Sequence, residues 1–349
     1  MASKSDAPFW KGGLLAFLAA LTFGAGTPVV QRCGRGVGPF TTAALLFFGS
    51  ALSSLGGRTE KQAPLRASHA PRLLGVAAFG AVLAPAALSW GLQHAGGTAA
   101  SLLLNLEAVF TVLLARAFFH EQISARAGVS LALMTGGGAW LVLDGTTDVS
   151  GSRWGLVAVA AATLFWAADN TVLRPLADLD TSRVVRWKSG LGAGASLCIA
   201  LLRREATPSA QTIGELVLCG IFGYGLSLRL YLHAQRRIGA GRTGSIFAAA
   251  PFAGALVALA LGDRTATSAA LFVALLFAAG IYLQITEKHE HAHTHEPTEH
   301  EHAHTHDDGH HDHAHDPPVI GEHSHVHRHE ALVHEHPHAP DIHHQHPHG

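Results

Sequence analysis

Apolar stretches of roughly twenty residues recur along the first 286 positions of this chain, with short polar breaks between them. One helix needs ~20 apolar residues to cross a bilayer core of ~30 Å, so the pattern predicts a membrane protein. A soluble helical core would need polar faces at helical spacing, and segments 102–119 and 248–261 have almost none. The chain is therefore expected to be all-α, with ten spans at 12–31, 39–56, 72–92, 98–119, 125–143, 153–172, 185–202, 212–234, 241–261 and 266–286.

The composition supports the same interpretation. Of the 349 residues, 48% are hydrophobic and only 14% are charged, which excludes an ordinary soluble enzyme. The first apolar run continues through positions 27–30 without the cleavage pattern of a signal peptide, so it is expected to be a retained span. Motifs for phosphate loops, dinucleotides and metalloproteases are missing from the sequence. Neither ATP-driven pumping, nor enzymatic activity, nor a nucleic-acid partner is therefore expected.

Positive charge indicates how the spans are oriented. If the N-terminus is cytoplasmic, 18 Lys and Arg residues fall on the cytoplasmic side and 6 on the opposite side. Loops rich in Lys and Arg stay inside the cell, so this distribution predicts a cytoplasmic N-terminus. An even number of spans then places the C-terminus in the cytoplasm as well. The expected location is the inner (plasma) membrane, as a multi-pass protein.

The hydrophobic body also repeats itself. A shift of 142 residues superimposes Phe23 on Phe165 and Phe110 on Phe252, and it divides the spans into two sets of five, 12–143 and 153–286. Because five is odd, the second set must enter the membrane in the opposite sense. Inverted repeats are a common build for secondary transporters, which place the substrate between the halves near the midplane. The repeat therefore predicts a transporter.

Several motifs resemble the EamA-like branch of the drug/metabolite transporter superfamily. They are NLEAVF at 105–110, FHEQIS at 119–124, FWAADN at 165–170, GYGLSL at 223–228, IGAGRTG at 238–244 and APF at 250–252. The resemblance implies two inverted five-helix repeats and the export or exchange of small organic molecules. In this chain Ala108 follows the buried glutamate, where the family often has proline.

Glu107 is the most distinctive ionisable residue inside a predicted span. It lies ten residues after Gly97 and 12 before Phe119, and burying its charge costs ~2.5 kcal/mol or more on membrane-insertion scales. Such a carboxyl suits proton uptake and release, or cation binding, as substrate crosses. The alternative is a structural group that is hydrogen-bonded between helices. Its equivalent in the second half is Ala249, so the two halves differ chemically here.

Other polar and aromatic residues are further candidates for substrate or proton contacts. Asp169 and Asn170, towards the end of the sixth span, either line the transport path or form an interfacial cap that pairs with Arg174. Helix-end aromatic belts and polar caps would also explain the weaker candidates. These are Asn105, Trp90, Gln93, Tyr231 and His233.

The tail, residues 287–349, differs sharply from the body. From position 289 onward it has 23 of the 27 histidines, 12 Asp and Glu, and one Arg. With few apolar residues it cannot form a core, so it is expected to be disordered and cytoplasmic. Imidazole is a good ligand for divalent transition metals, which predicts adaptable binding of zinc, nickel or cobalt. The candidate ligands are His289, His291, His293, His295, His300, His302, His304, His306, His323, His325, His327 and His329.

A charge-based role for the tail is the alternative to metal binding. At the reference histidine pKa of ~6.5, roughly a quarter of the imidazoles are protonated at pH 7. The tail would then respond to pH, or serve only as a solvated extension.

Together these features predict a secondary-active, proton-coupled exporter of a small metabolite that resides in the lipid bilayer and requires no cofactor. One alternative is a transition-metal transporter that collects nickel, cobalt or zinc with the tail. Another is a membrane metal sensor that transports nothing. Removal of residues 289–349 would alter cellular metal content or tolerance in the metal transporter, and would change little in the metabolite exporter.

Overall fold

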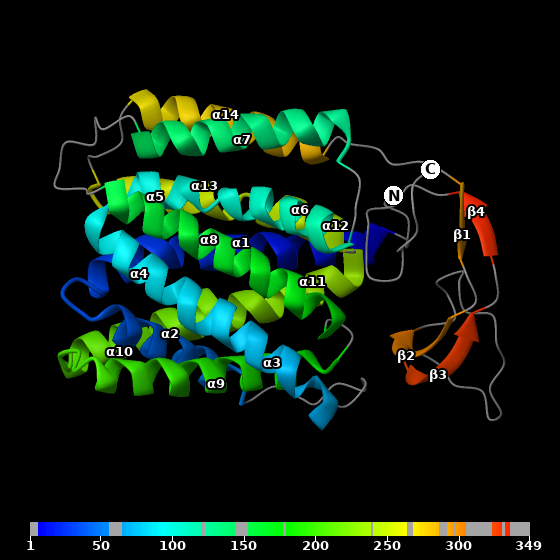
Figure 1. Ribbon diagram of the computed structural model, residues 1–349, viewed down its shortest axis with the longest axis horizontal. Helices are drawn as coiled ribbons and strands as arrows, with labels where there is room; N and C mark the ends of the chain where they lie inside the picture. Colours follow the sequence, from blue (N-terminus) through cyan, green and yellow to red (C-terminus); the bar gives the residue numbers. More distant parts are fainter. Residues whose placement is uncertain are drawn as a thin grey trace.

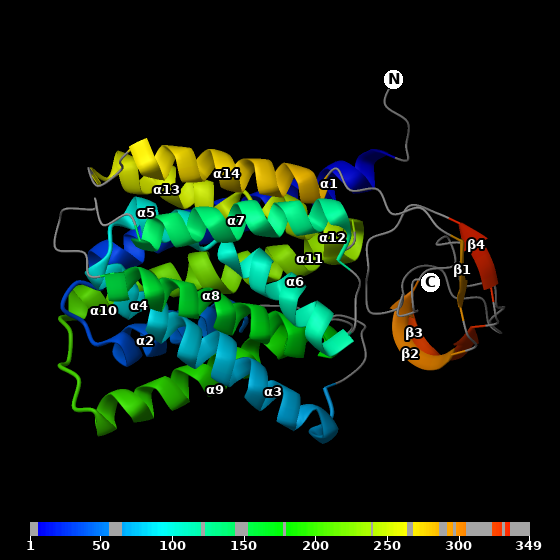
Figure 2. The ribbon, with the colours of Figure 1, turned by 45° about the horizontal axis from the view of Figure 1, so that its top comes forward.

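The computed structural model describes residues 6–55, 65–119, 123–143, 153–176, 179–238, 240–263, 268–285, 292–295, 298–304, 323–329 and 332–335. Up to residue 285 the described chain is almost entirely helical, and its long helices lie side by side (Figure 1, Figure 2). In lipid, a helix satisfies its own backbone hydrogen bonds, which explains why the apolar stretches take this form.

The first half of the body contains α1 (Asp6–Cys33), α2 (Pro39–Ser53), η1 (Ala67–His69), α3 (Ala70–Val76), η2 (Ala77–Leu83), α4 (Ala84–His94), α5 (Gly97–Leu103), α6 (Leu106–Phe119) and α7 (Ala125–Leu143). The second half contains α8 (Arg153–Leu173), η3 (Arg174–Leu176), α9 (Thr181–Leu202), α10 (Ala210–Cys219), η4 (Gly220–Leu226), α11 (Ser227–Ile238), α12 (Ala240–Phe247), α13 (Ala250–Ala260) and α14 (Ser268–Ile285). The segments η2 and η4 are π-helical, whereas η1 and η3 are short 3₁₀ turns.

The first helices of the two halves run in opposite directions. Helix α1 ends beside the end of α4, where the Gln31 side chain donates to the Ala95 carbonyl at 2.8 Å. Helix α8 instead begins there, because Gly155 lies directly beside His94. We call this the distal end of the bundle, and the end at which α1 begins the proximal end (Figure 1).

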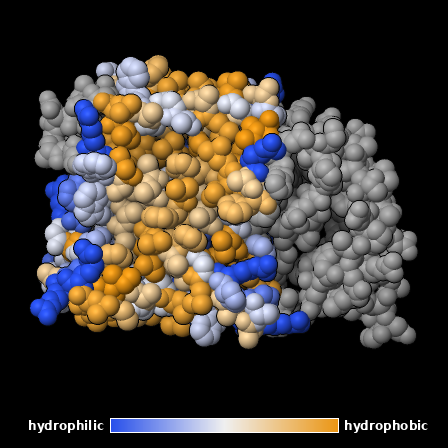
Figure 3. Space-filling model, in the orientation of Figure 1, coloured by the Kyte–Doolittle hydropathy of each residue, from blue (hydrophilic) through white to orange (hydrophobic). Residues whose placement is uncertain are grey.

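The bundle has the surface of a membrane protein. Seven helical stretches among the described residues are long and apolar enough to cross a bilayer, and Pro39–Ser53 and Ser268–Leu283 are shorter apolar helices. Large side chains such as Leu256 and Leu271 point outward, each 67% exposed. An apolar surface covers the middle of the bundle, with hydrophilic residues gathered towards both ends (Figure 3). Helix α9 belongs neither to the seven long apolar stretches nor to the two shorter apolar helices. Its N-terminal part carries Arg183, Arg186 and Lys188.

The two halves pack on each other reciprocally. Helix α2 lies against η4 while α9 lies against η2, α1 lies against α11 while α8 lies against α4, and α1 lies against α13 while α8 lies against α6. Each π-helical segment has seven residues, and their first residues, Ala77 and Gly220, are 143 positions apart. The halves therefore share one local irregularity, and each presents it to the second helix of the other half.

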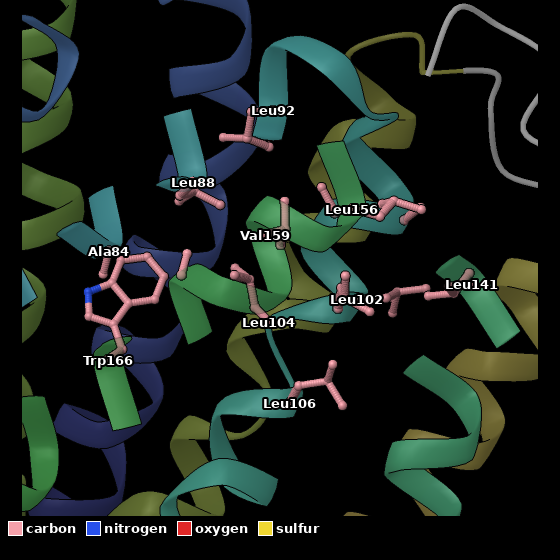
Figure 4. Packing of buried hydrophobic residues seen from close by; sticks show 14 of the residues in the cluster. Ala84, Leu88, Leu92, Leu102, Leu104, Leu106, Leu141, Leu156, Val159 and Trp166 are labelled. Carbon is pink, nitrogen blue, oxygen red and sulfur yellow. The ribbon is translucent and has the colours of Figure 1, made fainter. Parts of the chain in front are cut away.

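A hydrophobic cluster fills the space between α4, α5 and α8 (Figure 4). Leu88 and Leu103 are essentially inaccessible, and so is Val159. Association of helices in lipid depends on close packing and interhelical hydrogen bonds rather than on removal from water. The many alanines of the cluster and its neighbours permit that packing.

The tail contains four short strands among its described residues. Strand β1 (Ala292–His295) pairs antiparallel with β4 (Leu332–Glu335), and β2 (Thr298–His304) pairs antiparallel with β3 (His323–His329). These segments depart from the expected disorder of the tail. Histidine alternates there with other residues, and this period of two matches an extended strand.

Candidate functional site

The fourth predicted span, 98–119, is not one continuous helix. A turn at Leu104 and Asn105 separates α5 from α6, and the amides of Asn105 and Ala108 bond three residues back, to Leu102 and Asn105, instead of four. The Asn105 side chain is buried and also donates to the Leu102 carbonyl at 3.0 Å. The N-terminus of α6 thus lies within the fourth predicted span, and Gly97–Phe118 as a whole is long and apolar enough to cross a bilayer, as predicted.

Glu107 occupies the first turn of α6. The peptide dipoles of α6 place partial positive charge at its first turn, which favours a negative side chain there. The side chain is half-buried, and its Oε1 accepts a hydrogen bond of 2.7 Å from Asn170 Nδ2 on α8. Glu107 belongs to the first half and Asn170 to the second. The hydrogen bond therefore joins the two halves, and Asn170 is exposed there.

Asp169 lies next to Asn170 in sequence but points elsewhere. Its carboxylate forms an ion pair with Lys188 of α9, and both residues are almost fully buried, at 3% and 4% exposure. The sequence-based alternative paired Asp169 with Arg174, but the structure pairs it with Lys188. Asp169 and Lys188 both lie close enough to act electrostatically on Glu107. The three charged groups form one cluster, contributed by α6, α8 and α9.

The cluster is bordered by aromatic side chains. The Phe23 ring lies 5.7 Å from Trp166, 5.8 Å from Tyr224 and 5.7 Å from Phe247, measured between ring centroids. Tyr231 packs edge-on against Phe247 at 5.0 Å, and Glu107 acts electrostatically on its hydroxyl. Tyr231 therefore lies near the charged cluster, where a residue that contacts substrate or protons is expected.

Other sequence candidates lie elsewhere. Trp90 stacks on His94 at 4.2 Å near the distal end and is 38% exposed. The Gln93 side chain donates to the Val37 carbonyl at 2.9 Å, so it ties α4 to the loop before α2. His233 is half-buried on α11, and a separation of two residues turns it about 200° round the helix from Tyr231. These three residues are not brought together with Glu107.

The metal prediction rests on the tail. No group of three or more His, Cys, Asp or Glu residues suited to a metal ion occurs among the residues described by the structure. Of the candidate ligands, His289, His291 and His306 lie outside the described residues, whereas the others fall within β1, β2 and β3. Metal binding by the tail stays a prediction.

Comparison with known proteins identifies the family. The model of the EamA-like transporter family matches the chain twice, over residues 10–143 and 153–286. This chain belongs to the EamA-like transporter family. The resemblance seen in the sequence motifs is thereby confirmed, and so is the prediction of a multi-pass membrane transporter.

Two curated relatives agree with this assignment. An "Uncharacterized transporter" of Methanothermobacter thermautotrophicus is 27% identical over 212 residues, a match of 59% of this chain and 62% of the relative. A "Probable terminal-alkyne amino-acid exporter" of Streptantibioticus cattleyicolor is 25% identical over 251 residues, a match of 70% of this chain and 84% of the relative. A solved crystal structure shares the fold, with a TM-score of 0.58 at 19% identity. The match covers 79% of this chain and 98% of the chain in that structure.

Sequence reasoning on this EamA-like protein missed Lys188. We expected the seventh span to begin at residue 185, which left Lys188 at the cytoplasmic boundary. Helix α9 begins at Thr181, where the Asp180 side chain caps the helix by accepting from the Arg183 amide at 3.1 Å. That earlier start places Lys188 about two turns into the helix. The N-cap at Asp180, a residue type favoured at that position, was the available signal.

Proposed function

We propose that this protein is a secondary-active, proton-coupled exporter of a small organic metabolite. The observation that supports it best is the hydrogen bond between Glu107 and Asn170. It joins one repeat to the other at a place where Asn170 is exposed, and secondary transporters bind their substrates between such repeats. Residues of both repeats would have to separate there as the protein alternates between its two open states.

The Glu107–Asn170 pair suits a carboxyl that gains and loses a proton. An asparagine side chain has both donor and acceptor atoms. Its Nδ2 donates to the charged carboxylate, and its Oδ1 accepts from the protonated carboxyl after rotation of the amide. Asn170 can therefore bind either form of Glu107.

The architecture we propose is ten membrane helices in two inverted five-helix repeats. The opposite directions of α1 and α8 support the inversion, as does the reciprocal packing of the halves. Helix α9 is the least apolar of the proposed spans, and it contains Lys188, which is paired inside the bundle. The proximal end would face the cytoplasm in the inner membrane, because most Lys and Arg residues belong to that side.

Export of an organic metabolite is favoured by the relatives. One of them bears the name of an amino-acid exporter. The cluster of Glu107, Asp169 and Lys188 presents charges of both signs, which suits a polar organic molecule. We therefore place the substrate among small charged or zwitterionic metabolites.

The test begins with cells that contain or lack the intact gene, compared by metabolomics of medium and cytoplasm. An accumulated external metabolite would then be added to proteoliposomes that contain a pH-sensitive dye and the full-length protein. Wild type should move protons when the metabolite is added, whereas Glu107→Gln should not. Normal proton movement in Glu107→Gln would contradict the proposal.

Glu215→Gln is the matched control. Glu215 lies on α10 and accepts from Gln211 at 2.8 Å on the outside of the bundle. This substitution removes a carboxylate of equal size from a place remote from the cluster, so proton movement should persist. The melting temperature of each variant shows whether it folds.

A further inference from the structure

The Asp169–Lys188 ion pair is an unusual feature for the interior of a membrane protein. A buried pair gains stability only when its geometry is good and further hydrogen bonds satisfy its remaining atoms. Here the second carboxylate oxygen, Asp169 Oδ1, is buried, and none of the described residues donates a hydrogen bond to it. The pair is therefore incompletely satisfied in this state.

The surroundings of the pair are built to hold it in one place. Gly80 lies against the Asp169 carboxyl, where any Cβ would overlap it. The Trp166 indole N–H, one turn before Asp169 on α8, donates to the Gly80 carbonyl at 3.3 Å. Helix α8 and the π-helical segment η2 thus fix the carboxylate, while Lys188 reaches it from α9 along a flexible side chain. Of the two partners, Lys188 has the longer and more flexible side chain.

The local charges would balance around a ligand that itself carries both signs. A carboxylate of the ligand can replace Asp169 beside the Lys188 ammonium group. An ammonium group of the ligand can pair with Asp169 Oδ1, and the Glu107 carboxyl is near enough to interact electrostatically with Asp169. A purely cationic ligand would leave Lys188 buried without a partner, and a purely anionic one would do the same to Asp169. Each of those outcomes leaves an uncompensated buried charge.

We infer that the Asp169–Lys188 pair is the binding site for the head group of a small zwitterion with one carboxylate and one ammonium group, which opens the pair and takes the place of each partner. The inference rests on the proposed transport function and names the substrate class for the same cluster. Lys188 sets the specificity for the carboxylate.

Binding to the full-length wild-type protein in detergent is the first test. The twenty proteinogenic amino acids serve as probes, with the shift in melting temperature as the readout. For the best binder, the matched amine without the carboxylate and the matched acid without the amine are compared; for leucine these are 3-methylbutylamine and 4-methylpentanoate. The zwitterion should bind at least tenfold more tightly than either. Failure of all twenty to bind, or equal binding of the amine or the acid, overturns the inference.

A charge-swapped variant, Asp169→Lys with Lys188→Asp, separates recognition from stability. It keeps a buried ion pair but exchanges its signs, so a purely structural pair predicts unchanged binding. We expect at least tenfold weaker binding, and wild-type affinity in the swapped protein would overturn the inference. Arg183→Gln is the control, because Arg183 pairs with Asp180 on the same helix and is 45% exposed. If the swapped protein does not fold, the wild-type comparison of zwitterion, amine and acid still decides.

The outcome for transport is separate. Export of a metabolite that lacks one of the two charged groups would overturn the zwitterion site and leave the proposed transport function intact. Absence of any exported metabolite would count against transport itself.

Discussion

Gly80 lies so close to Asp169 that a Cβ at position 80 would overlap the Asp169 carboxyl group. The contact joins η2 of the first half to α8 of the second. Its effect is to let α8 approach the π-helical segment closely enough for the Trp166 indole to reach the Gly80 carbonyl.

Replacement of Gly80 by alanine should therefore destabilise the protein. Forcing an extra methyl group into a packed interior costs about 1–3 kcal/mol, and here it would also displace the Asp169–Lys188 pair. The measurement is the unfolding free energy in detergent. Gly136→Ala on α7 is the control, because that glycine is exposed and has no atom within 4 Å of the added Cβ. Equal stability of the two variants would show that Gly80 is not closely packed.

Removal of one partner of the buried pair should be worse than removal of both. Lys188→Met leaves the Asp169 charge buried and unpaired, and Asp169→Leu does the same to Lys188, which typically costs about 3–5 kcal/mol. The double variant removes both charges, so it should recover much of that loss. Melting curves of the four proteins form a double-mutant cycle. Losses that simply add up would mean that the pair is not coupled.

Glu205 should stabilise the start of α2. Its carboxylate accepts from the Thr41 amide and the Thr41 hydroxyl, both at 2.7 Å, and from the Phe40 amide at 3.3 Å. Loss of a helix cap costs about 0.5–2 kcal/mol, so Glu205→Ala should lower the unfolding free energy by that amount. Glu215→Ala, which removes a carboxylate that caps no helix, should change it little. A Glu205→Ala protein as stable as wild type would exclude the capping role.

Topology can be read from single cysteines. In a protein whose Cys33, Cys198 and Cys219 are replaced by serine, an impermeant maleimide should label Arg35→Cys in intact cells. Arg237→Cys should be labelled only after permeabilisation, because the proximal end is expected to face the cytoplasm. Both positions are exposed in the structure. The reverse labelling pattern would require the protein to be inverted in the membrane.

The tail should bind metal without being needed for export. Untagged full-length protein should be retained on a nickel column, and protein that lacks residues 289–349 should pass through. Metabolite export should be the same for both. A changed cellular nickel, cobalt or zinc content after the deletion would favour the metal-transport alternative instead.

The sequence predicted the transporter class because the relevant signals are local. Length and hydropathy of the apolar stretches define most of the helices, and the even spacing of the two halves reveals the repeat. Glu107 was found for the same reason, since a carboxyl deep in an apolar stretch is visible without a structure.

The parts that the sequence did not predict depend on tertiary packing. The turn at Leu104 and Asn105 contains neither proline nor glycine, so no local signal marks it. Asp169 and Lys188 are separated by 19 residues and by the connection between α8 and α9. Their pairing follows from the way α8 and α9 each pack against η2. The hydrogen bond of Asn170 to Glu107 likewise depends on the packing of α8 against α6, which the sequence does not reveal.

The reciprocal packing of η2 and η4 has a consequence for the two halves as separate molecules. Each half packs its irregular helix against the first and second helices of the other half. A fragment that ended after α7 would expose η2 to lipid, with nothing to occupy the face that α9 now covers. Such a half-length protein would have to recruit a second copy of itself, or the missing half, before it could reach a packed state.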